Sequence, residues 1–451
     1  MNQTKLKGQR VAVVICTWNK REFVLQCIQS VLSSNYRELE IIVVDNDSSD
    51  GTADAVRKQF PNVKLIVNSE NLGGAGGFNT GLNYVLAADC FDFVHLLDND
   101  TVVAPDATQG LVDALQARPN AACCGSKIMH MDEPDRIQEI GAFLKWNSCK
   151  VKLNQQYRKD RRPQNKKTVS VDYVPACSMM VRVSALKHIS IMDYEYFIYF
   201  DDIEWCTRFK RAGYEIIATR ASTVWHKGGG REKLSHAPLY YWCRNEGFFF
   251  NSYLPDKIWR RGMRSWLRTY VRAMAACSTF DKPNASSVYF KAIDDLRNNR
   301  RGRAPDNFDF SIDQEPSGGV RDTFRGASIC VARRGPAGAV KGMLGKLLDP
   351  DQIHLEDYSY NAKTCDFYVL PVDHVLGVKT NDDDDDDDDG LDPGAFLVDP
   401  HSNVLAPGLE GQSKKREGMS VFTHIMQSEG HQLLADLVDI RNASKSVREN
   451  R

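Results

Sequence analysis

Residues 11–20 read VAVVICTWNK and residues 40–52 read EIIVVDNDSSDGT, and these two segments decide the fold. Each begins with an unbroken run of apolar residues, which is typical of a strand buried on both faces of a sheet. Residues 21–34, between them, carry apolar side chains at helical spacing. A buried strand, a helix and a second buried strand predict parallel pairing, with the helix packed on the sheet.

The alternation of strand and helix continues to residue 100. Expected helices cover residues 50–60 and 76–88, and expected strands cover residues 63–67 and 91–97. Repeated units of this kind predict an α/β fold with a mostly parallel central sheet and helices on both faces. Ligands of such sheets bind beyond the carboxyl ends of the strands. Residues that follow the strand ends are therefore the first candidates for a functional site.

Beyond residue 119 the pattern changes to shorter strands followed by helices. The expected short strands cover residues 121–129, 138–144, 169–174, 176–183, 215–219 and 223–225. Residues 150–167 are polar and basic, which indicates a mobile loop. Residues 201–213 predict a helix that ends at Gly213. Helical periodicity then runs from residue 239 to about residue 301.

Three polar residues, Thr17, Asp45 and Asp98, each follow the end of an expected strand. We expect them to converge at one edge of the sheet. Asp98 also begins the triplet Asp98-Asn99-Asp100, in which two carboxylates can meet one divalent cation. Oxygen ligands suit Mg²⁺ or Mn²⁺, which also hold diphosphate oxygens. A lone triplet of this kind is also common in solvated turns, so its partners elsewhere in the chain decide its meaning.

Two segments near these strand ends could contact a ligand. Asp45 can accept a hydrogen bond from the N3–H of a uracil or thymine ring, while Ser49 or Asp50 caps the helix that follows. Residues 71–81 read NLGGAGGFNTG and open a helix, so their backbone can approach a ligand closely. Asn79 stands where a dinucleotide fingerprint requires glycine, which excludes that motif. A plain flexible turn is the alternative interpretation.

Two later motifs could complete a catalytic centre. Asp201 and Asp202 begin an expected helix, whose dipole stabilises carboxylates, and one of them could accept a proton from an acceptor hydroxyl. Plain helix-start charge is the alternative. Trp225-His226 ends a short strand, and His226 could complete the coordination of an ion at Asp98 and Asp100. The glycine-rich basic residues 227–231 could close over a diphosphate.

The whole chain narrows the class of protein. It has 451 residues, 42% of them hydrophobic, and a formal net charge of −1, which indicates no polyanionic partner. Its 12 cysteines are scattered without a CxxC pair, which is typical of reduced thiols in a cytosolic setting. The polar N-terminus lacks the apolar region of a signal peptide, and no run is long enough to span a membrane. We expect a soluble protein or one bound to a membrane surface.

The C-terminal half divides by charge. Residues 257–303 are rich in lysine and arginine, with Trp259, Trp266 and Tyr270 at helical spacing between them. Such a helix suits anionic lipid headgroups, and a core-packed helix with a solvated basic face is the alternative. Without a recognition motif, nucleic-acid binding is not expected. Residues 382–389 are an unbroken aspartate run, which predicts a disordered, solvated spacer. Residues 424–441 could form a short terminal helix.

Seven segments, in order and spacing, resemble the family-2 inverting glycosyltransferases of the GT-A fold. They read VAVVICTWNK, EIIVVDNDSSDGT, NLGGAGGFNTGL, LLDNDTVV, ACSMMVRVSAL, YFDDIEWCTRFKRAGYEI and VWH. The resemblance covers residues 9–230 and extends loosely to about residue 303. It implies a GT-A catalytic domain over residues 1–235, a basic helical region over residues 236–303, and a C-terminal region of unknown role over residues 304–451.

The resemblance also implies roles for individual residues. Asp202, paired with Asp201, would be the catalytic base, and attack opposite the diphosphate would invert the anomeric carbon. The metal, Mn²⁺ or Mg²⁺, would be bound by Asp98, Asp100 and His226. The nucleotide-sugar would be bound by a set of eight residues: Thr17, Trp18, Asp45, Asn71, Gly74, Asn79, Asp98 and Trp225.

The motifs are most similar to bacterial galactofuranosyltransferases, which use UDP-galactofuranose, and next to rhamnosyltransferases, which use dTDP-rhamnose. The resemblance implies a lipid-linked or polysaccharide acceptor in cell-surface glycan synthesis, and a cytoplasmic protein on the inner face of the membrane. Alternatives are a sugar nucleotidyltransferase, a non-catalytic carbohydrate-binding scaffold and a membrane-surface adaptor. Thr17-Trp18-Asn19 after the first strand disfavours the nucleotidyltransferase, which would need a glycine-rich basic segment there.

Overall fold

The computed structural model describes most of the chain up to residue 311 and short segments beyond it. The described ranges are residues 9–161, 166–228, 235–279, 283–311, 329–332, 353–356, 367–371, 395–398, 404–406, 436–438 and 440–441. The chain divides into two compact units. The first consists of Met1–Lys233, Phe248–Tyr253 and Arg300–Phe308, and the second of Leu234–Gly247, Leu254–Asn299 and Asp309–Arg451.

The first four strands of the main sheet are parallel, as the sequence predicts. β1 (Val11–Thr17) lies between β2 (Leu39–Asp45) and β4 (Phe93–Asp98), and β3 (Lys64–Val67) pairs with the outer edge of β2. Thr17 is in register with Asp45, and Cys16 with Asp98. The carboxyl ends of these strands therefore meet at one edge of the sheet.

The other half of the sheet mixes parallel and antiparallel strands. The order is β10-β12-β6-β11-β4-β1-β2-β3, with β5 paired to β12 and β7 paired to β6. The bounds are β5 (Thr101–Val103), β6 (Ala121–His130), β7 (Ile137–Glu139), β10 (Thr168–Ser170), β11 (Ser178–Arg182) and β12 (Glu215–His226). The two strands predicted for residues 215–219 and 223–225 are one strand, β12, because an irregularity between Thr219 and Thr223 bends it without ending it.

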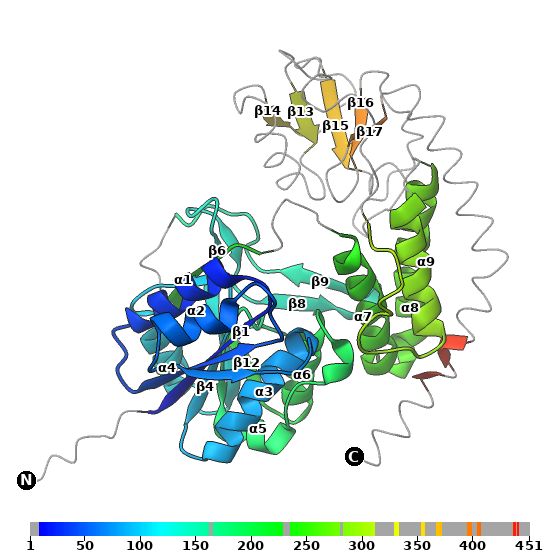
Figure 1. The fold of residues 1–451 in the computed structure, drawn as a ribbon. Coiled ribbons are helices and arrows are strands. Elements are labelled where there is room, and N and C mark those ends of the chain that lie inside the picture. The colour runs from blue at the N-terminus through cyan, green and yellow to red at the C-terminus, as the bar shows by residue number, and fades with distance from the viewer. Residues whose placement is uncertain are drawn as a thin grey trace, which may run out of the picture. The chain divides into compact units, whose positions relative to one another are not determined.

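Helices cover both faces of this sheet (Figure 1). One face carries α1 (Arg21–Leu32), α2 (Thr52–Gln59) and α4 (Ala107–Ala117), and the other carries α3 (Gly73–Ala88), α5 (Val183–Ile189) and α6 (Asp201–Arg211). The alternation of side chains along β1 explains the two layers. Val11, Val13 and Ile15 join the core beneath α1 and α4, whereas Val14 faces Gly81 of α3. The predicted α/β class is confirmed.

The mobile loop predicted for residues 150–167 was wrong over residues 150–153. β9 (Lys150–Leu153) pairs with β8 (Ala142–Lys145) in an antiparallel hairpin. Lys150 and Lys152 are exposed, while Val151 and Leu153 between them are half-buried. This period of two is a strand pattern that the high lysine content obscures. Residues 162–165 lie outside the described residues.

The second unit contains helices and a second sheet. The helical prediction is confirmed by α7 (Ala237–Tyr253), whose last turns belong to the first unit, α8 (Asp256–Thr279) and α9 (Pro283–Arg297). The second sheet has the order β14-β13-β15-β16-β17 and is parallel except for β17. Its strands are β13 (Ile329–Ala332), β14 (Ile353–Glu356), β15 (Phe367–Pro371), β16 (Ala395–Val398) and β17 (Val404–Ala406).

Helix α8 buries its aromatic side within the protein. Trp259, Trp266 and Tyr270 are buried, whereas Lys257, Arg260, Arg261, Arg264 and Arg268 are exposed. The core-packed position of these aromatics is confirmed, and binding of the basic face to lipid headgroups stays a prediction. None of the helices in the described part of the chain is long and apolar enough to cross a membrane.

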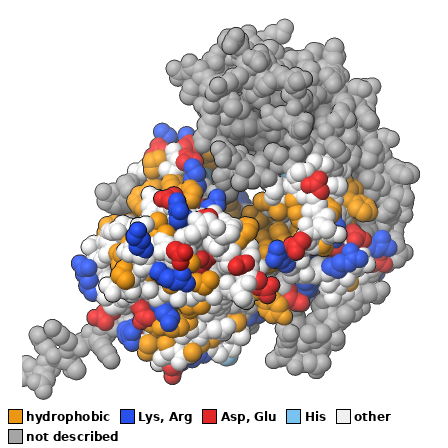
Figure 2. Space-filling view, viewed as in Figure 1, with side chains coloured by type: hydrophobic (Ala, Val, Ile, Leu, Met, Phe, Trp, Pro, Cys, Tyr) orange, Lys and Arg blue, Asp and Glu red, His pale blue; other side chains and the backbone are white. Residues whose placement is uncertain are grey.

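On the face shown in Figure 2, lysine and arginine side chains are interspersed with aspartate and glutamate over the described surface. This mixture agrees with the net charge of −1. The aspartate run at residues 382–389 lies outside the described residues. Of the predicted terminal helix over residues 424–441, the structure describes helical residues 436–438 and 440–441.

Candidate active site

The ends of β4 and β12 bring two acids and a histidine together. His226 is in register with Thr101 of β5, which follows Asp100 directly. The His226 Nε2 atom lies 3.2 Å from Asp100 Oδ1 and 3.6 Å from Asp98 Oδ2. On its other side, Nδ1 lies 3.2 Å from Gln138 Oε1, which fixes the orientation of the ring. The structure therefore brings together Asp98, Asp100 and His226, which the sequence predicts as metal ligands.

Cys177 is a neighbour that the sequence analysis did not single out. Ligand atoms of Asp98, Cys177 and His226 all lie within 4.8 Å of one another. Burial raises the pKa of the Cys177 thiol to about 12, so this thiol is neutral at pH 7. Burial alone would lower the pKa of His226, but Cys177 and the hydrogen bond to Asp100 raise it. No signal in the sequence separates Cys177 from the other buried cysteines.

The donor set fits a divalent cation. Two carboxylates and an imidazole supply the oxygen and nitrogen atoms that Mn²⁺ accepts, whereas Mg²⁺ prefers oxygen alone. Cys177 lies within reach of the same site, and a thiolate would favour a softer metal. The two carboxylates and the imidazole are compatible with Mn²⁺.

Asp45 carries a buried acceptor without a partner. Its Oδ1 accepts a hydrogen bond from the Ser48 backbone N–H at 3.0 Å, while Oδ2 has none from the residues that the structure describes. A buried, unsatisfied carboxylate oxygen is costly, and an incoming N–H donor would satisfy it. Nearby, Asn99 Nδ2 donates to Thr17 Oγ1 at 3.2 Å, and the Trp18 side chain is 50% exposed. This edge of the sheet can receive a flat, hydrogen-bonding ring.

The glycine-rich segment is first of all a packing device. Gly73 has a φ of +74°, and a Cβ there would lie 2.2 Å from the carbonyl oxygen of Phe197. At Gly81 an added Cβ would lie 2.3 Å from Val14 Cγ1 of β1. These close approaches let α3 lie against the sheet and against the segment before α6. The glycines are thus not a flexible turn.

The other nominated residues of this region differ in what they contact. Asn71 Oδ1 accepts hydrogen bonds from Asn46 Nδ2 and from the Gly73 backbone N–H. An added Cβ at Gly74 would lie 4.0 Å from Asp201 Oδ2, so Gly74 faces the acidic pair. Asn79 is buried. Its Nδ2 donates to the Met192 carbonyl oxygen, and its Oδ1 accepts from the Met192 backbone N–H. The structure does not bring Asn79 to the strand ends.

Trp225 precedes His226 on β12. It is half-buried and packs against the core cluster beneath α1 and α4. Its assignment to donor binding, like that of Asn79, stays a prediction.

Asp201 and Asp202 sit at the buried start of α6. The backbone before them is left-handed at Tyr199 (φ 64°) and Phe200 (φ 69°), a conformation that costs non-glycine residues about 1–3 kcal/mol each. Burial raises the pKa of Asp202 to about 6, and raises that of Asp201 well above its ordinary value, with the Asp202 charge as the next cause. The Ala176 backbone N–H donates to Asp202 Oδ2 at 3.2 Å and partly stabilises its charge.

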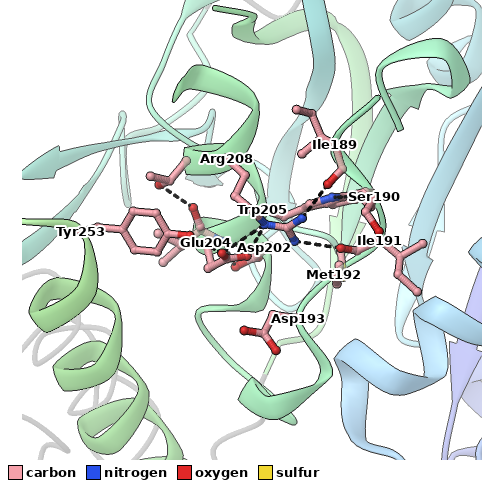
Figure 3. A network of polar contacts seen from close by, with 12 residues as sticks. Ile189, Ser190, Ile191, Met192, Asp193, Asp202, Glu204, Trp205, Arg208 and Tyr253 are labelled. Carbon is pink, nitrogen blue, oxygen red and sulfur yellow. Dashed lines mark hydrogen bonds and ion pairs between the residues drawn. The ribbon is translucent and has the colours of Figure 1, made fainter. Parts of the chain in front are cut away.

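A network of polar contacts fixes the position of α6 (Figure 3). The Arg208 guanidinium donates to the carbonyl oxygens of Ile189 and Ile191 at 2.9 and 2.8 Å, and to both carboxylate oxygens of Glu204. Trp205 Nε1 donates to the Ser190 carbonyl at 2.8 Å, and Tyr253 donates to Glu204. Glu204 and Trp205, which follow the aspartate pair in the sequence, therefore hold the start of α6 in place.

Glu139 is a second acid that the sequence analysis missed. It lies on the three-residue strand β7, is buried, and has a pKa raised to about 8 by burial and then by the Asp202 charge. Its Oε2 has no hydrogen-bond partner in the described part of the chain. A single acid in so short a strand carries no sequence signal, and only the pairing of β7 with β6 reveals its position.

Comparisons with known proteins find similar sequences among glycosyltransferases. The family model described as glycosyl transferase family 2 matches residues 12–190. The N-acetylglucosaminyl-diphospho-decaprenol L-rhamnosyltransferase of Mycobacterium tuberculosis is 24% identical over 280 residues, which cover 57% of this chain and 88% of that protein. The galactofuranosyltransferase GlfT1 of Mycolicibacterium smegmatis is 24% identical over 228 residues, covering 49% and 72%. A solved structure of GalNAc-T7 with UDP, GalNAc and Mn²⁺ aligns with a TM-score of 0.45 and 13% identity, covering 65% of this chain and 54% of that one.

Proposed function

Because this chain belongs to glycosyl transferase family 2, we propose that it moves a sugar from a nucleoside diphosphate donor to an acceptor hydroxyl, with inversion at the anomeric carbon. One observation carries the proposal. Asp98, Asp100 and His226 converge at the carboxyl edge of the sheet, where Asp45 keeps an unsatisfied oxygen. The two acids and the histidine suit a metal–diphosphate group, and the unsatisfied oxygen of Asp45 suits a nucleobase.

The nucleobase would bind at the ends of β1 and β2. The free Oδ2 of Asp45 would accept the N3–H of a uracil or thymine ring. The exposed Trp18 would cover the ring, and Thr17 lies beside Asp45 in register. Burial makes the Asp45 bond selective, since a base without a donor would leave the oxygen unsatisfied.

The diphosphate would bind at the metal site. Asp98, Asp100 and His226 would hold Mn²⁺ or Mg²⁺, with Mn²⁺ favoured by the imidazole. The bound ion supplies charge neutralisation for the leaving diphosphate. Gln138 orients His226, so that its Nε2 stays turned toward the two carboxylates.

Asp202 would act as the general base. With a pKa of about 6 it is deprotonated at neutral pH, yet basic enough to accept a proton from an acceptor hydroxyl. Asp201, whose pKa burial raises well above its ordinary value, would be the second acid of the pair. The backbone N–H groups of Ala176 and Ile203 donate to the two oxygens of Asp202 at 3.2 and 2.7 Å and fix the carboxylate in position.

We favour UDP-galactofuranose as the donor, with dTDP-rhamnose as the alternative. The similar proteins include a galactofuranosyltransferase and a rhamnosyltransferase, so both donors have a precedent among them. The acceptor would be a lipid-linked oligosaccharide or a polysaccharide in cell-surface glycan synthesis. Such an acceptor places the chain at the inner face of the cell membrane.

The test compares three donors in the presence of Mn²⁺: UDP-galactofuranose, UDP-galactopyranose and dTDP-rhamnose. Metal-dependent hydrolysis or transfer of UDP-galactofuranose alone is the expected result. Preference for dTDP-rhamnose would keep the site and change the donor. If none of the three binds, with or without metal, the donor assignment is wrong and a non-catalytic scaffold becomes the better hypothesis.

A further inference from the structure

A cavity of about 780 Å³ lies in the first unit, lined by residues that the active site does not use. We call it the basic pocket, after the cations that line it: Arg136, Arg158, Lys159, Arg161, Lys167 and Arg220. It is built from β7, β10, the irregular part of β12 and the turn that follows β9. This volume falls in the range of pockets that hold small molecules.

The charge of the basic pocket is only partly compensated. Arg136 pairs with Glu133 at 2.9 Å, Lys159 pairs with Asp135 at 3.4 Å, and Arg220 pairs with Asp160. Asp160 is the only acid among its described lining residues, and it is buried between Lys127, at 2.5 Å, and Arg220. Two cations therefore neutralise one carboxylate there. Arg158 and Arg161 are exposed, and the described part of the chain offers neither of them an ion pair. Arginine left unpaired at a concave surface favours an anionic ligand.

The basic pocket adjoins the active site through β7. Ile137 lines the pocket, and Glu139, two residues further along the same strand, is close enough for the Asp202 charge to raise its pKa. Side chains two apart point to the same side of a strand and are separated by about 7 Å. Between them, Gln138 contacts His226. The pocket and the active site therefore share strand β7, with Ile137 at the pocket and Gln138 at His226.

We propose that the basic pocket binds a phosphate group of the acceptor, so that the acceptor is a phosphate-linked sugar rather than a neutral glycan. This inference rests on the proposed function. The donor diphosphate would bind through the metal ion at Asp98 and Asp100. The cations of the basic pocket would therefore serve a second phosphate. Arginine matches phosphate because its planar guanidinium forms two parallel hydrogen bonds. A lipid diphosphate can supply this group, and so can free phosphate.

The test measures binding of geranyl diphosphate and, separately, of inorganic phosphate by calorimetry. The protein is kept saturated with UDP and Mg²⁺, so the donor site is occupied. The test variant is Arg158→Gln with Arg161→Gln, and the matched control is Lys150→Gln with Lys152→Gln. The control removes the same charge from exposed positions of the neighbouring β9, and none of the four side chains forms an ion pair with a described residue.

Geranyl diphosphate should bind the wild type and the control alike, and the test variant about 10–100-fold more weakly, as expected for lost charge-assisted hydrogen bonds. Inorganic phosphate should bind more weakly than geranyl diphosphate. Equal weakening in both variants would mean that binding depends only on the overall positive charge, and would overturn the proposal. Tighter binding of inorganic phosphate than of geranyl diphosphate, or no binding of either, would also overturn it.

Donor hydrolysis separates this inference from the proposed function. The test variant should hydrolyse the nucleotide-sugar with Mn²⁺ at the wild-type rate, since the basic pocket lies outside the donor site. Loss of hydrolysis in the test variant alone would assign the pocket to the donor and overturn the inference. Absence of hydrolysis in the wild type would count against the proposed function, whereas the binding result would stand by itself.

Discussion

At the scale of single residues, Asp202 and Glu139 differ in pKa because their surroundings differ. Asp202 receives a backbone N–H from Ala176, while Glu139 has an oxygen with no partner in the described part of the chain. Their pKa values, about 6 and about 8, differ in the direction that this contrast predicts. At neutral pH the first is charged and the second is protonated, so only Asp202 is ready to accept a proton.

Asp202→Asn should reduce kcat about 10²–10⁴-fold, the usual contribution of a general base. Donor binding should stay within a few-fold, because the nucleotide contacts other residues. Steady-state kinetics and donor titration measure the two quantities. Glu139→Gln is the matched control, since the amide resembles the protonated acid, and it should keep most of the activity at pH 7. A large loss in the control with little loss in Asp202→Asn would make Glu139 the base.

The pH dependence of kcat/KM should show an acidic limb near pH 6. Burial raises the pKa of Asp202, and a base works only when deprotonated, so activity is present above about pH 6 and is lost as the pH falls. Profiles between about pH 3 and pH 9 measure this limb in the free enzyme. The limb should persist in Glu139→Gln. A limb near the ordinary aspartate value of about 4 would contradict the assignment.

At the scale of elements, the sequence predicts the parts of the site that follow from strand ends. Thr17, Asp45 and Asp98 could be placed together because parallel strands bring their carboxyl ends to one edge. Gln138, Glu139 and the basic pocket could not, since β7 is too short to recognise and its place beside β6 is a tertiary pairing. The hairpin at residues 150–153 was hidden by its lysines.

The glycine-rich segment gives a prediction at this scale. Gly81→Ala should lower the free energy of unfolding by about 1–3 kcal/mol, because the added methyl would lie against Val14 and force α3 away from β1. Urea unfolding measures the change. Asn83→Ala, at an exposed position of the same helix, should have almost no effect. Equal stability of the two variants would mean that α3 can shift at no cost.

Arg208 links the position of α6 to activity. Lysine would keep the charge but lose the fork that reaches the carbonyls of Ile189 and Ile191. Arg208→Lys should therefore cost about 1–3 kcal/mol of stability and reduce kcat more than it changes donor binding. Arg57→Lys, at an exposed pair on α2, is the control and should change neither. If Arg208→Lys is destabilised but keeps its kcat, the Arg208 contacts stabilise α6 without positioning Asp202 for catalysis.

At the scale of the whole molecule, the proposed active site lies in the first unit and the basic helix α8 in the second. Lys257, Arg260, Arg261, Arg264 and Arg268 form an exposed basic face on α8, which we call the α8 face. Trp259 and Trp266, beneath it, are 5% and 1% exposed. Contact with a membrane would therefore be electrostatic, without insertion of aromatic side chains.

Binding to vesicles that contain phosphatidylglycerol should depend on charge alone. Replacing Arg260, Arg261 and Arg264 by glutamine should weaken binding by about 3 kcal/mol, at about 1 kcal/mol per cation, and high salt should abolish it in the wild type. The control removes the same charge from Arg57, Lys58 and Lys64 in the first unit and should retain binding. Co-sedimentation measures the affinity, and tryptophan emission tests insertion. A blue shift that survives high salt would mean that Trp259 or Trp266 leaves the core to enter lipid, whereas equal loss in both triple variants would exclude the α8 face as the membrane contact.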